Sequence, residues 1–209
     1  MNIKTKKILE LLNKEYPNVK CELNYNTPFQ LLVATILSAQ TTDKKVNEVT
    51  KQLFIDYPTV YNFSKLTIPE LEDKIRKIGL YRNKAKNILK TVKMLIEEYN
   101  GQVPSKFDDL VSLHGVGRKT ANVVLANAFN VPTIAVDTHV FRVSNRIGLA
   151  NAKDVLQTEK DLQKNIPKKD WIEAHHLFIF HGRNLCIARK PKCEICPINR
   201  ECKYFNQAE

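Results

Sequence analysis

The sequence predicts a compact all-α protein, and three observations support this prediction. Apolar residues recur at helical spacing through most of the 209 residues, whereas the alternation typical of β-strands is hard to find. Helix start and stop signals bracket several of these stretches. The connections between them are short, and no Pro/Gly/Ser-rich linker, fixed-period repeat or low-complexity tract interrupts them. The hydrophobic content of 43% suffices for one large or two modest domains.

The first half of the chain carries the clearest helix signals. Thr27 followed by Pro28 opens an apolar helix, because proline is already shaped for the first helical turn. Thr67 with Glu70 three residues later has the capping-box pattern that starts a second helix. The strongest amphipathic pattern follows over residues 85–99, with apolar side chains three and four residues apart. These segments are therefore predicted to be helices joined by short turns.

Composition restricts the class of function. The chain has 33 Lys and Arg residues against 22 Asp and Glu, a formal net charge of +11. Such a charge is typical of a polyanion-binding protein, but the solvated helix faces of an ordinary lysine-rich protein explain it equally well. No apolar stretch approaches the roughly 20 residues that span a bilayer, and the N-terminus lacks the pattern of an export signal or transit peptide. We therefore expect a cytoplasmic protein without a membrane segment.

Four of the five cysteines form a C-x6-C-x2-C-x5-C run near the C-terminus, made of Cys186, Cys193, Cys196 and Cys202. So short a segment can wrap four thiolates around one metal centre, which suits either a structural zinc or a [4Fe-4S] cluster. Disulfides are not expected, because nothing upstream indicates secretion. Cys21 is left over.

Residues 113–120 place two glycines between two predicted helices, the first of which is expected to be capped near Ser105. Gly115 and Gly117 permit positive φ and close approach of the backbone to a ligand. The following helix presents N–H groups and a positive dipole end, where a phosphate would fit. Such a hairpin would hold the DNA backbone without reading base sequence. Standing alone, however, Gly-x-Gly would be better explained as an ordinary turn between helices.

Two candidate catalytic residues accompany this hairpin. Lys119 lies in the first turn of the following helix beside Arg118, where its charged form is disfavoured, and this helps to supply the neutral amine that covalent chemistry requires. Asp137 is expected at the start of the next helix, where it can accept a proton or stabilise a developing cation. The structural alternatives are a phosphate-binding lysine and an aspartate that only caps its helix.

Residues 113–124, residues 136–143 and the cysteine run together resemble the endonuclease III family of helix-hairpin-helix DNA glycosylases, over nearly the whole chain. This resemblance implies two helical domains that flank a DNA cleft. Residues 21–131 would form a six-helix barrel containing the hairpin, and residues 1–20 and 132–209 a discontinuous iron-sulfur domain. The cysteine spacing matches that of the family, which favours a [4Fe-4S] cluster over zinc. A structural or DNA-binding role is expected for the cluster, since full cysteine ligation leaves no open iron.

The resemblance also implies a mechanism, in which Lys119 attacks C1′ of a damaged nucleotide and Asp137 is the essential carboxylate. Loss of the base leaves positive charge at C1′, which Asp137 stabilises, and neutral Lys119 then forms a Schiff base. The iminium acidifies the C2′ protons, so β-elimination breaks the 3′ phosphodiester bond. The implied protein is a bifunctional DNA glycosylase and AP lyase of base excision repair. It would act as a monomer at the nucleoid, on double-stranded DNA with oxidised pyrimidines or abasic sites.

Further residues are implied to contact DNA. Gln40 matches the glutamine that fills the space left by the everted nucleotide, and Leu80, after Gly79, matches the apolar residue inserted into the opposite strand. Without the resemblance, they would be a polar helix-end residue and a core contact beyond a C-cap. The cations between the first two cluster cysteines are expected on phosphates, although they can also offset the charge of the cluster. The remaining candidates are His114, Gly115, Val116, Gly117, Arg118, Arg189, Lys190 and Lys192.

Two positions depart from the family pattern. His114 stands where the family usually has proline, so we expect a less rigid hairpin that keeps its backbone N–H donors. Thr41, where alanine is common, is expected to be a minor change. No metal is assigned to the remaining histidines, which are expected to pack and hydrogen-bond inside helices: His139, His175, His176 and His181.

Two readings from other functional classes stay open at the level of sequence. One is a helix-hairpin-helix protein that binds DNA without catalysis, and the other is a structural or interaction module stapled by zinc. Broad visible absorption would separate an iron-sulfur cluster from zinc. Borohydride trapping of a protein–DNA adduct would separate an enzyme from a binding module.

Overall fold

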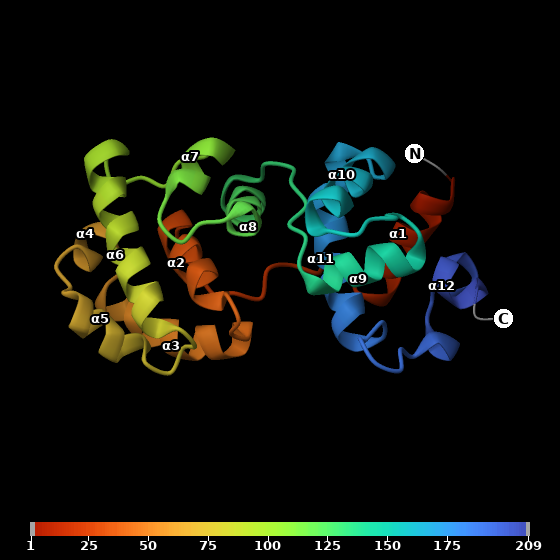
Figure 1. Cartoon of the computed structure of the whole chain (residues 1–209), viewed down its shortest axis with the longest axis horizontal. Helices are drawn as coiled ribbons and strands as arrows, with labels where there is room; N and C mark the ends of the chain where they lie inside the picture. Colours follow the sequence, from red (N-terminus) through yellow and green to blue (C-terminus); the bar gives the residue numbers. More distant parts are fainter. Residues whose placement is uncertain (1–2, 208–209) are drawn as a thin grey trace. The chain divides into compact units, whose positions relative to one another are not determined.

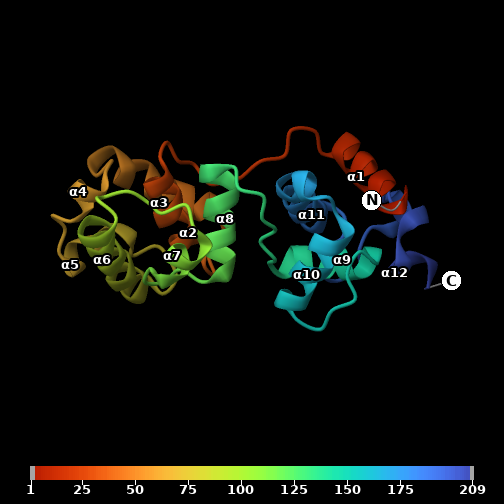
Figure 2. The ribbon, with the colours of Figure 1, turned by 90° about the horizontal axis from the view of Figure 1, so that it is seen from above.

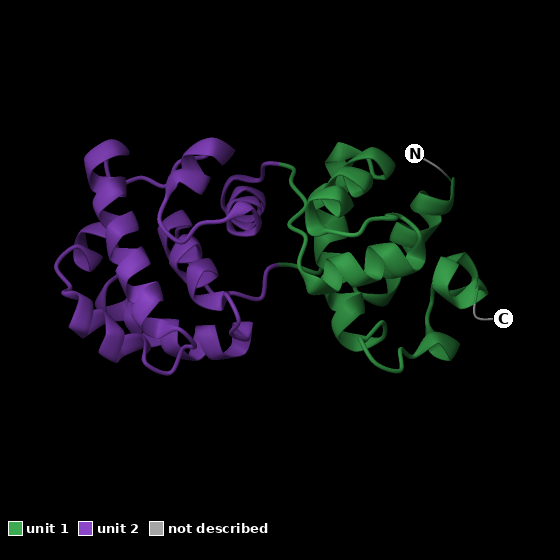
Figure 3. Ribbon diagram, in the orientation of Figure 1, with its two compact units in different colours: residues 1–20, 132–209 green, residues 21–131 purple. Residues whose placement is uncertain are grey.

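The structure, a computed structural model, describes residues 3–207, and this part of the chain contains helices and no β-strand (Figure 1). The prediction of an all-α protein is therefore confirmed. The chain divides into two compact units, which Figure 3 colours separately. One unit is Cys21–Val131, and the other combines the residues through Lys20 with those from Pro132 onward. Within the described residues, no helix has both the length and the apolar character needed to cross a membrane.

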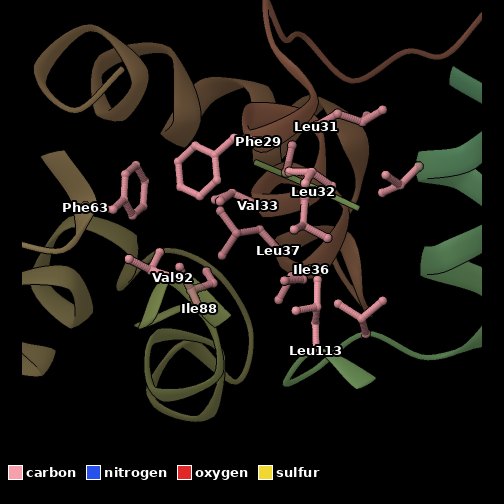
Figure 4. Close-up of a cluster of buried hydrophobic side chains, with 14 of the residues drawn as sticks. Phe29, Leu31, Leu32, Val33, Ile36, Leu37, Phe63, Ile88, Val92 and Leu113 are labelled. Carbon is pink, nitrogen blue, oxygen red and sulfur yellow. The ribbon is translucent and has the colours of Figure 1, made fainter. Parts of the chain in front are cut away.

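The unit of residues 21–131 is built around one buried helix, α2. Phe29 to Leu37 of this helix are all buried, as expected for a helix that neighbours cover on every side. It contacts α3, α6 and α8, and Figure 4 shows its apolar side chains meeting those of α6. The rings of Phe29 and Phe63 pack edge to face with their centroids 5.2 Å apart. The helices of this fully described unit are α2 (Pro28–Ser38), α3 (Asp43–Asp56), α4 (Val60–Phe63), α5 (Ile68–Ile75), α6 (Tyr81–Glu98), α7 (Phe107–Ser112) and α8 (Arg118–Phe129).

Local capping explains where two of these helices begin. Thr27 caps α2, because its hydroxyl accepts the N–H of Gln30 at 3.2 Å. Thr67 and Glu70 form the predicted capping box of α5, in which a Glu70 carboxylate oxygen accepts the Thr67 N–H at 2.8 Å. Both predicted helix starts are confirmed.

The helix before the hairpin begins near Ser105, as predicted, although Ser105 itself is not the cap. The N-cap of α7 is Lys106 and not Ser105, and no side chain caps this helix. A serine two residues before a helix looks like a cap in the sequence, but only the residue that adopts the extended boundary conformation can serve as one. Lys106 does so, with φ −105° and ψ 143°.

The second unit joins the two ends of the chain. Ile8 and Leu12 of α1 pack in one core with Val140 and Val143 of α9 and with Phe178 of α11. Helix α1, red in Figure 2, lies beside α11. After α11, the described chain continues with two single-turn 3-10 helices and the short helix α12. The elements of this unit are α1 (Ile3–Glu15), α9 (Thr138–Ile147), α10 (Val155–Asn165), η1 (Lys168–Asp170), α11 (Trp171–Asn184), η2 (Cys193–Ile195), η3 (Asn199–Glu201) and α12 (Lys203–Asn206).

Candidate functional site

The four predicted cluster cysteines line one cavity. Cys186 follows α11, Cys193 begins η2, Cys196 ends it, and Cys202 precedes α12. None of these thiols forms a disulfide. The sequence spacing therefore brings all four predicted ligands together.

The electrostatic environment of this cavity disfavours the thiolate forms of the cysteines when no metal centre is bound. Burial is the main cause that raises the pKa of the Cys196 thiol to about 11, and the neighbouring Cys202, Cys186 and Cys193 raise it further. Burial, followed by Cys202 and Cys186, likewise raises the pKa of Cys193. Metal ligands must be deprotonated, so a cationic centre is needed to stabilise four thiolates here.

The arrangement of the ligands distinguishes a cluster from a single metal ion. Among residues 3–207, no group of three His, Cys, Asp or Glu side chains could hold one metal ion. Tetrahedral zinc requires four sulfurs at about 2.3 Å from one point. A [4Fe-4S] cluster is also held by four cysteines, but around a larger core. Four cysteines that line one cavity without converging on one ion fit the cluster better.

The loop between Cys186 and Cys193 is held by two arginines of α9. Arg142 donates to the Cys186 carbonyl at 3.0 Å, and Arg146 donates to two further loop carbonyls at 2.8 and 2.9 Å. Neither arginine stands out in the sequence, since a charged helix residue does not indicate its distant partner. The predicted phosphate contacts of this loop are all exposed: Arg189, Lys190 and Lys192.

The glycine-containing hairpin lies between α7 and α8 and provides space for a ligand. Gly115 has φ +77°, and a Cβ there would meet the Asn87 side chain at 3.0 Å, so glycine is required. A Cβ at Gly117 would meet nothing within 4 Å, and Gly117 is the N-cap of α8 without a side-chain cap. Val116 is buried and donates its N–H to the Leu113 carbonyl at 3.2 Å, so it anchors the hairpin.

The hairpin residues on either side of these glycines are also held in place. The His114 side chain is exposed, while its carbonyl accepts the Thr91 hydroxyl of α6 at 2.9 Å. Arg118 is exposed as well, and its guanidinium lies 4.9 Å from the ring centroid of Phe107. The hydrogen bond from Thr91 uses a backbone carbonyl, so it does not depend on the residue type at position 114.

The two predicted catalytic residues occupy the first turns of two different helices. Lys119 is the second residue of α8 and is exposed. Asp137 is the N-cap of α9, and its Oδ1 accepts the N–H groups of His139 at 2.9 Å and Val140 at 2.8 Å. Its Oδ2 lies 3.1 Å from Nδ1 of His139. The capping alternative for Asp137 is thus realised, and it leaves open a second role for the same carboxylate.

Gln40 occupies an unusual backbone conformation. Ala39 has φ −57° and ψ 115°, Gln40 has φ +57°, and the Thr41 N–H donates to the Ser38 carbonyl at 3.1 Å. This is a type II turn whose third residue is normally glycine, because its φ is positive. The Gln40 side chain is exposed, so packing does not explain why glutamine stands there.

Leu80 is a second exposed residue with positive φ. It is the N-cap of α6, with φ 57° and ψ 29°, and 59% of its surface is accessible. The interpretation of Leu80 as a core contact is excluded by this exposure. A bulky residue at positive φ is uncommon and disfavoured, and such positions cluster at functional sites.

Comparison with known families gives two matches. Residues 33–168 match the model of the HhH-GPD superfamily base excision DNA repair protein, and residues 186–202 match the iron-sulfur binding domain of endonuclease III. Endonuclease III of Bacillus subtilis (strain 168) is 52% identical over 196 residues, covering 93% of this chain and 90% of that protein. Endonuclease III of Haemophilus influenzae is 50% identical over 208 residues, covering 99% of each.

Solved structures give the same result. A trapped endonuclease III–DNA covalent intermediate matches with a TM-score of 0.92 and 49% identity, over 100% of this chain and 99% of that one. A non-covalent endonuclease III–DNA complex matches equally well. A thermostable thymine-DNA glycosylase, at 23% identity and a TM-score of 0.87, shares the fold. The match over residues 186–202, together with the full-length relatives, identifies the group bound by this segment as a [4Fe-4S] cluster.

Proposed function

Because the chain belongs to the endonuclease III family of the HhH-GPD superfamily, and is therefore a DNA glycosylase and AP lyase of base excision repair, we propose that it removes oxidised pyrimidines through a Schiff base on Lys119. One observation carries this proposal. Lys119 is exposed in the first turn of α8, directly behind the hairpin, in a chain similar to a trapped endonuclease III–DNA covalent intermediate. A nucleophilic lysine must reach the sugar from a position close to the bound DNA backbone.

The first chemical step is loss of the damaged base. The bond between C1′ and the base breaks, the electron pair leaves with the base, and positive charge develops at C1′. The Asp137 carboxylate stabilises this charge, because two backbone N–H groups hold it in one orientation. Oδ1 accepts both N–H groups, and Oδ2 lies 3.1 Å from Nδ1 of His139.

The second step forms and resolves the covalent intermediate. The neutral Lys119 amine bonds to C1′, and the bond from C1′ to the ring oxygen breaks as a proton passes from the attacking nitrogen to this oxygen. The resulting iminium draws electrons from C2′. Removal of a C2′ proton then expels the 3′ phosphate by β-elimination. Hydrolysis of the iminium returns the lysine and leaves a cleaved strand.

The surrounding residues bind and deform the DNA. Backbone N–H groups at Gly115 and Gly117, together with the exposed cation Arg118, would hold phosphates near the lesion. Gln40 and Leu80 would fill the duplex when the damaged nucleotide is everted. The loop cations would bind further phosphates: Arg189, Lys190 and Lys192.

The cluster belongs to the binding machinery in this proposal. Cys186, Cys193, Cys196 and Cys202 would hold it, since all four line the same cavity. When bound, it supplies a rigid cross-link for a segment that contains only two single-turn 3-10 helices. We further propose that the protein acts as a monomer, at the nucleoid, on duplex DNA with oxidised pyrimidines or abasic sites.

Borohydride trapping tests the proposed nucleophile. The parent protein should give a covalent adduct on a thymine-glycol duplex and on an abasic duplex, whereas Lys119→Gln should give none and still bind DNA. Lys93→Gln is the matched control, because Lys93 is an exposed lysine of α6 whose ammonium lies 3.7 Å from Glu97. An adduct on Lys119→Gln equal to that of the parent would assign the nucleophile elsewhere. No adduct on the parent would contradict the proposed Schiff base mechanism.

Asp137→Asn tests the first step separately from the second. The variant should lose most base removal from thymine glycol, since the amide cannot offset the charge at C1′. It should retain more trapping on a preformed abasic site, where no base has to leave. Equal losses on both substrates would point to a purely structural role of Asp137 as the cap of α9.

A further inference from the structure

We propose that Lys84 is a positioning residue, whose buried ammonium holds the turn bearing Gln40 beside the turn bearing Leu80, so that both side chains are ready to enter the duplex. This inference rests on the proposed function, because it assumes that these two residues fill the DNA. It concerns only the unit of residues 21–131. The sequence does not single out Lys84, which lies in a lysine-rich amphipathic stretch.

The Lys84 ammonium makes three hydrogen bonds to the turn. Its Nζ donates to the carbonyls of Leu37 at 2.9 Å and Ala39 at 2.7 Å, and to the Thr41 hydroxyl at 3.3 Å. These acceptors lie on both sides of Gln40 in the chain. An ammonium has three donors, so the whole hydrogen-bonding capacity of Lys84 is directed at this turn.

Burying the ammonium of Lys84 costs free energy, because the charge loses its hydration. Only 5% of Lys84 is accessible, and this burial lowers the pKa of its amine. The three acceptors are neutral, so they offset the loss of hydration less than a carboxylate would. An apolar side chain would fill the same volume without this cost. The ammonium is therefore best explained by what it holds in place.

The backbone of the same residue reaches the second turn. The Lys84 N–H donates to the Leu80 carbonyl at 3.1 Å, in the first turn of α6. The backbone at Gly79 lies against the first turn, since a Cβ there would be 3.7 Å from Thr41 Oγ1 and 3.9 Å from the Gln40 carbonyl oxygen. Lys84 thus joins the two turns, one through its side chain and the other through its backbone.

The strained backbone conformations of Gln40 and Leu80 explain why the two turns have to be held in place. Gln40 and Leu80 both have φ +57°, a conformation that is disfavoured for residues other than glycine. Both are exposed, so neither is held by packing of its own side chain. Such residues persist only where their surroundings fix the backbone. Lys84 provides that constraint, and the turns would be preorganised before DNA arrives.

Thr41 gives a second way to test the role of Lys84. The sequence gives no reason to expect Thr41 to have more than a minor role. The structure instead gives the Thr41 hydroxyl a specific contact, as the third acceptor of the Lys84 ammonium. Thr41→Ala should therefore weaken the same constraint, with a smaller effect than loss of the ammonium.

The test compares Lys84→Met with Lys93→Met, which removes an exposed charge from the same helix. Both variants are assayed on thymine glycol in a fully paired duplex, on thymine glycol in an unpaired bubble, and by trapping on a single-stranded abasic site. Lys84→Met should lose at least about tenfold on the paired duplex, because misplaced residues slow a positioned reaction. The bubble and the single strand should lose little, since no paired base has to be displaced. Lys93→Met should match the parent on all three substrates.

The selectivity of the loss separates positioning from folding. A uniform loss on all three substrates would indicate general structural damage and overturn the proposal, as would no loss on the paired duplex. If Lys84→Met does not fold, as judged by thermal unfolding, Thr41→Ala decides. It should lose about twofold or more on the paired duplex alone, consistent with one hydrogen bond to a charged group. An unchanged Thr41→Ala would then overturn the proposal.

A binding measurement distinguishes this proposal from the proposed chemistry. 2-Aminopurine is placed opposite a tetrahydrofuran abasic analogue, and its fluorescence should rise when the parent protein disturbs the base stack. Lys84→Met should bind this duplex with a smaller rise, whereas Lys119→Gln should match the parent. The proposed nucleophile can therefore fail while the Lys84 result stands. The positioning role fails if Lys84→Met gives the full rise.

Discussion

The turns bearing Gln40 and Leu80 and the segment bearing the four cysteines are stabilised in different ways. Each must hold irregular backbone in one shape outside the regular helices. The two turns are fixed by the protein itself, through the buried ammonium of Lys84. The cysteine segment contains only two single-turn 3-10 helices, and besides the hydrogen bonds from Arg142 and Arg146 it has its [4Fe-4S] cluster for the same purpose. Both regions have internal hydrogen bonds and contacts with a core, but the cysteine segment also surrounds four thiols that a metal centre has to join.

Removal of one cluster ligand should have the largest effect and tests this difference directly. Cys196→Ala should abolish broad visible absorption and lower the free energy of unfolding by about 3 kcal/mol or more, because metal binding is coupled to folding. Cys21→Ala is the matched control, since Cys21 is a partly buried thiol of the other unit that packs against its core. It should keep the absorption and lose no more than about 1 kcal/mol. Absorption spectra and denaturant titrations measure both quantities, and a folded, colourless Cys196→Ala of parental stability would break the comparison.

Glycine substitutions at the two turns should separate stability from activity. Gln40→Gly and Leu80→Gly should each raise the free energy of unfolding by about 0.5 to 1 kcal/mol, since glycine relieves the positive φ and little side-chain burial is lost. Both variants should nevertheless remove thymine glycol from paired duplex more slowly. Denaturant titration and single-turnover excision measure the two effects.

Alanine variants at the same positions provide the control. Gln40→Ala and Leu80→Ala also lose the side chain, but they keep the unfavourable φ, so excision should slow without a gain in stability. If the glycine variants were less stable than the alanine variants, the turns would not be strained. The contrast with the cysteine segment would then lose its physical basis.

The parts of the fold that sequence could predict are those fixed by neighbouring residues. The caps at Thr27 and Thr67 are local interactions, and the helical periodicity of residues 85–99 lies within one element. The cysteine run is equally local, which is why its four members could be grouped before their cavity was known. Ser105 shows the limit of such reasoning, because the choice between adjacent capping positions depends on the backbone conformation.

The parts that sequence could not predict depend on contacts between distant residues. Nothing in the sequence distinguishes Lys84 from the other lysines. Its ammonium donates to the carbonyl of Ala39, a residue more than forty positions away in the chain. Arg142 and Arg146 likewise reach loop carbonyls across about forty residues. The positive φ of Gln40 has no signal in the sequence, since glycine is the usual indicator and is not present there.

The hairpin is intermediate between the two turns and the cysteine segment, and it gives the prediction with the smallest expected effect. It is held by a hydrogen bond from α6, as the turns are, but it carries His114 at a position where proline would stiffen it. Leu113 has φ −71° and ψ 144°, the extended conformation that a following proline requires. His114→Pro should therefore raise the free energy of unfolding by about 0.5 kcal/mol, mainly by restricting the unfolded chain.

Activity on the His114→Pro variant then shows what the exposed imidazole does. The Thr91 hydroxyl should still reach the carbonyl at position 114, so the hairpin should keep its shape and its N–H donors. Binding to an abasic duplex and excision of thymine glycol should then match the parent within about twofold, as measured by titration and single-turnover rates. A clear loss of DNA affinity with unchanged or higher stability would instead give the His114 side chain a direct contact with DNA. In that case the hairpin would resemble the turns at Gln40 and Leu80, which are proposed to contact the duplex through side chains as well as backbone.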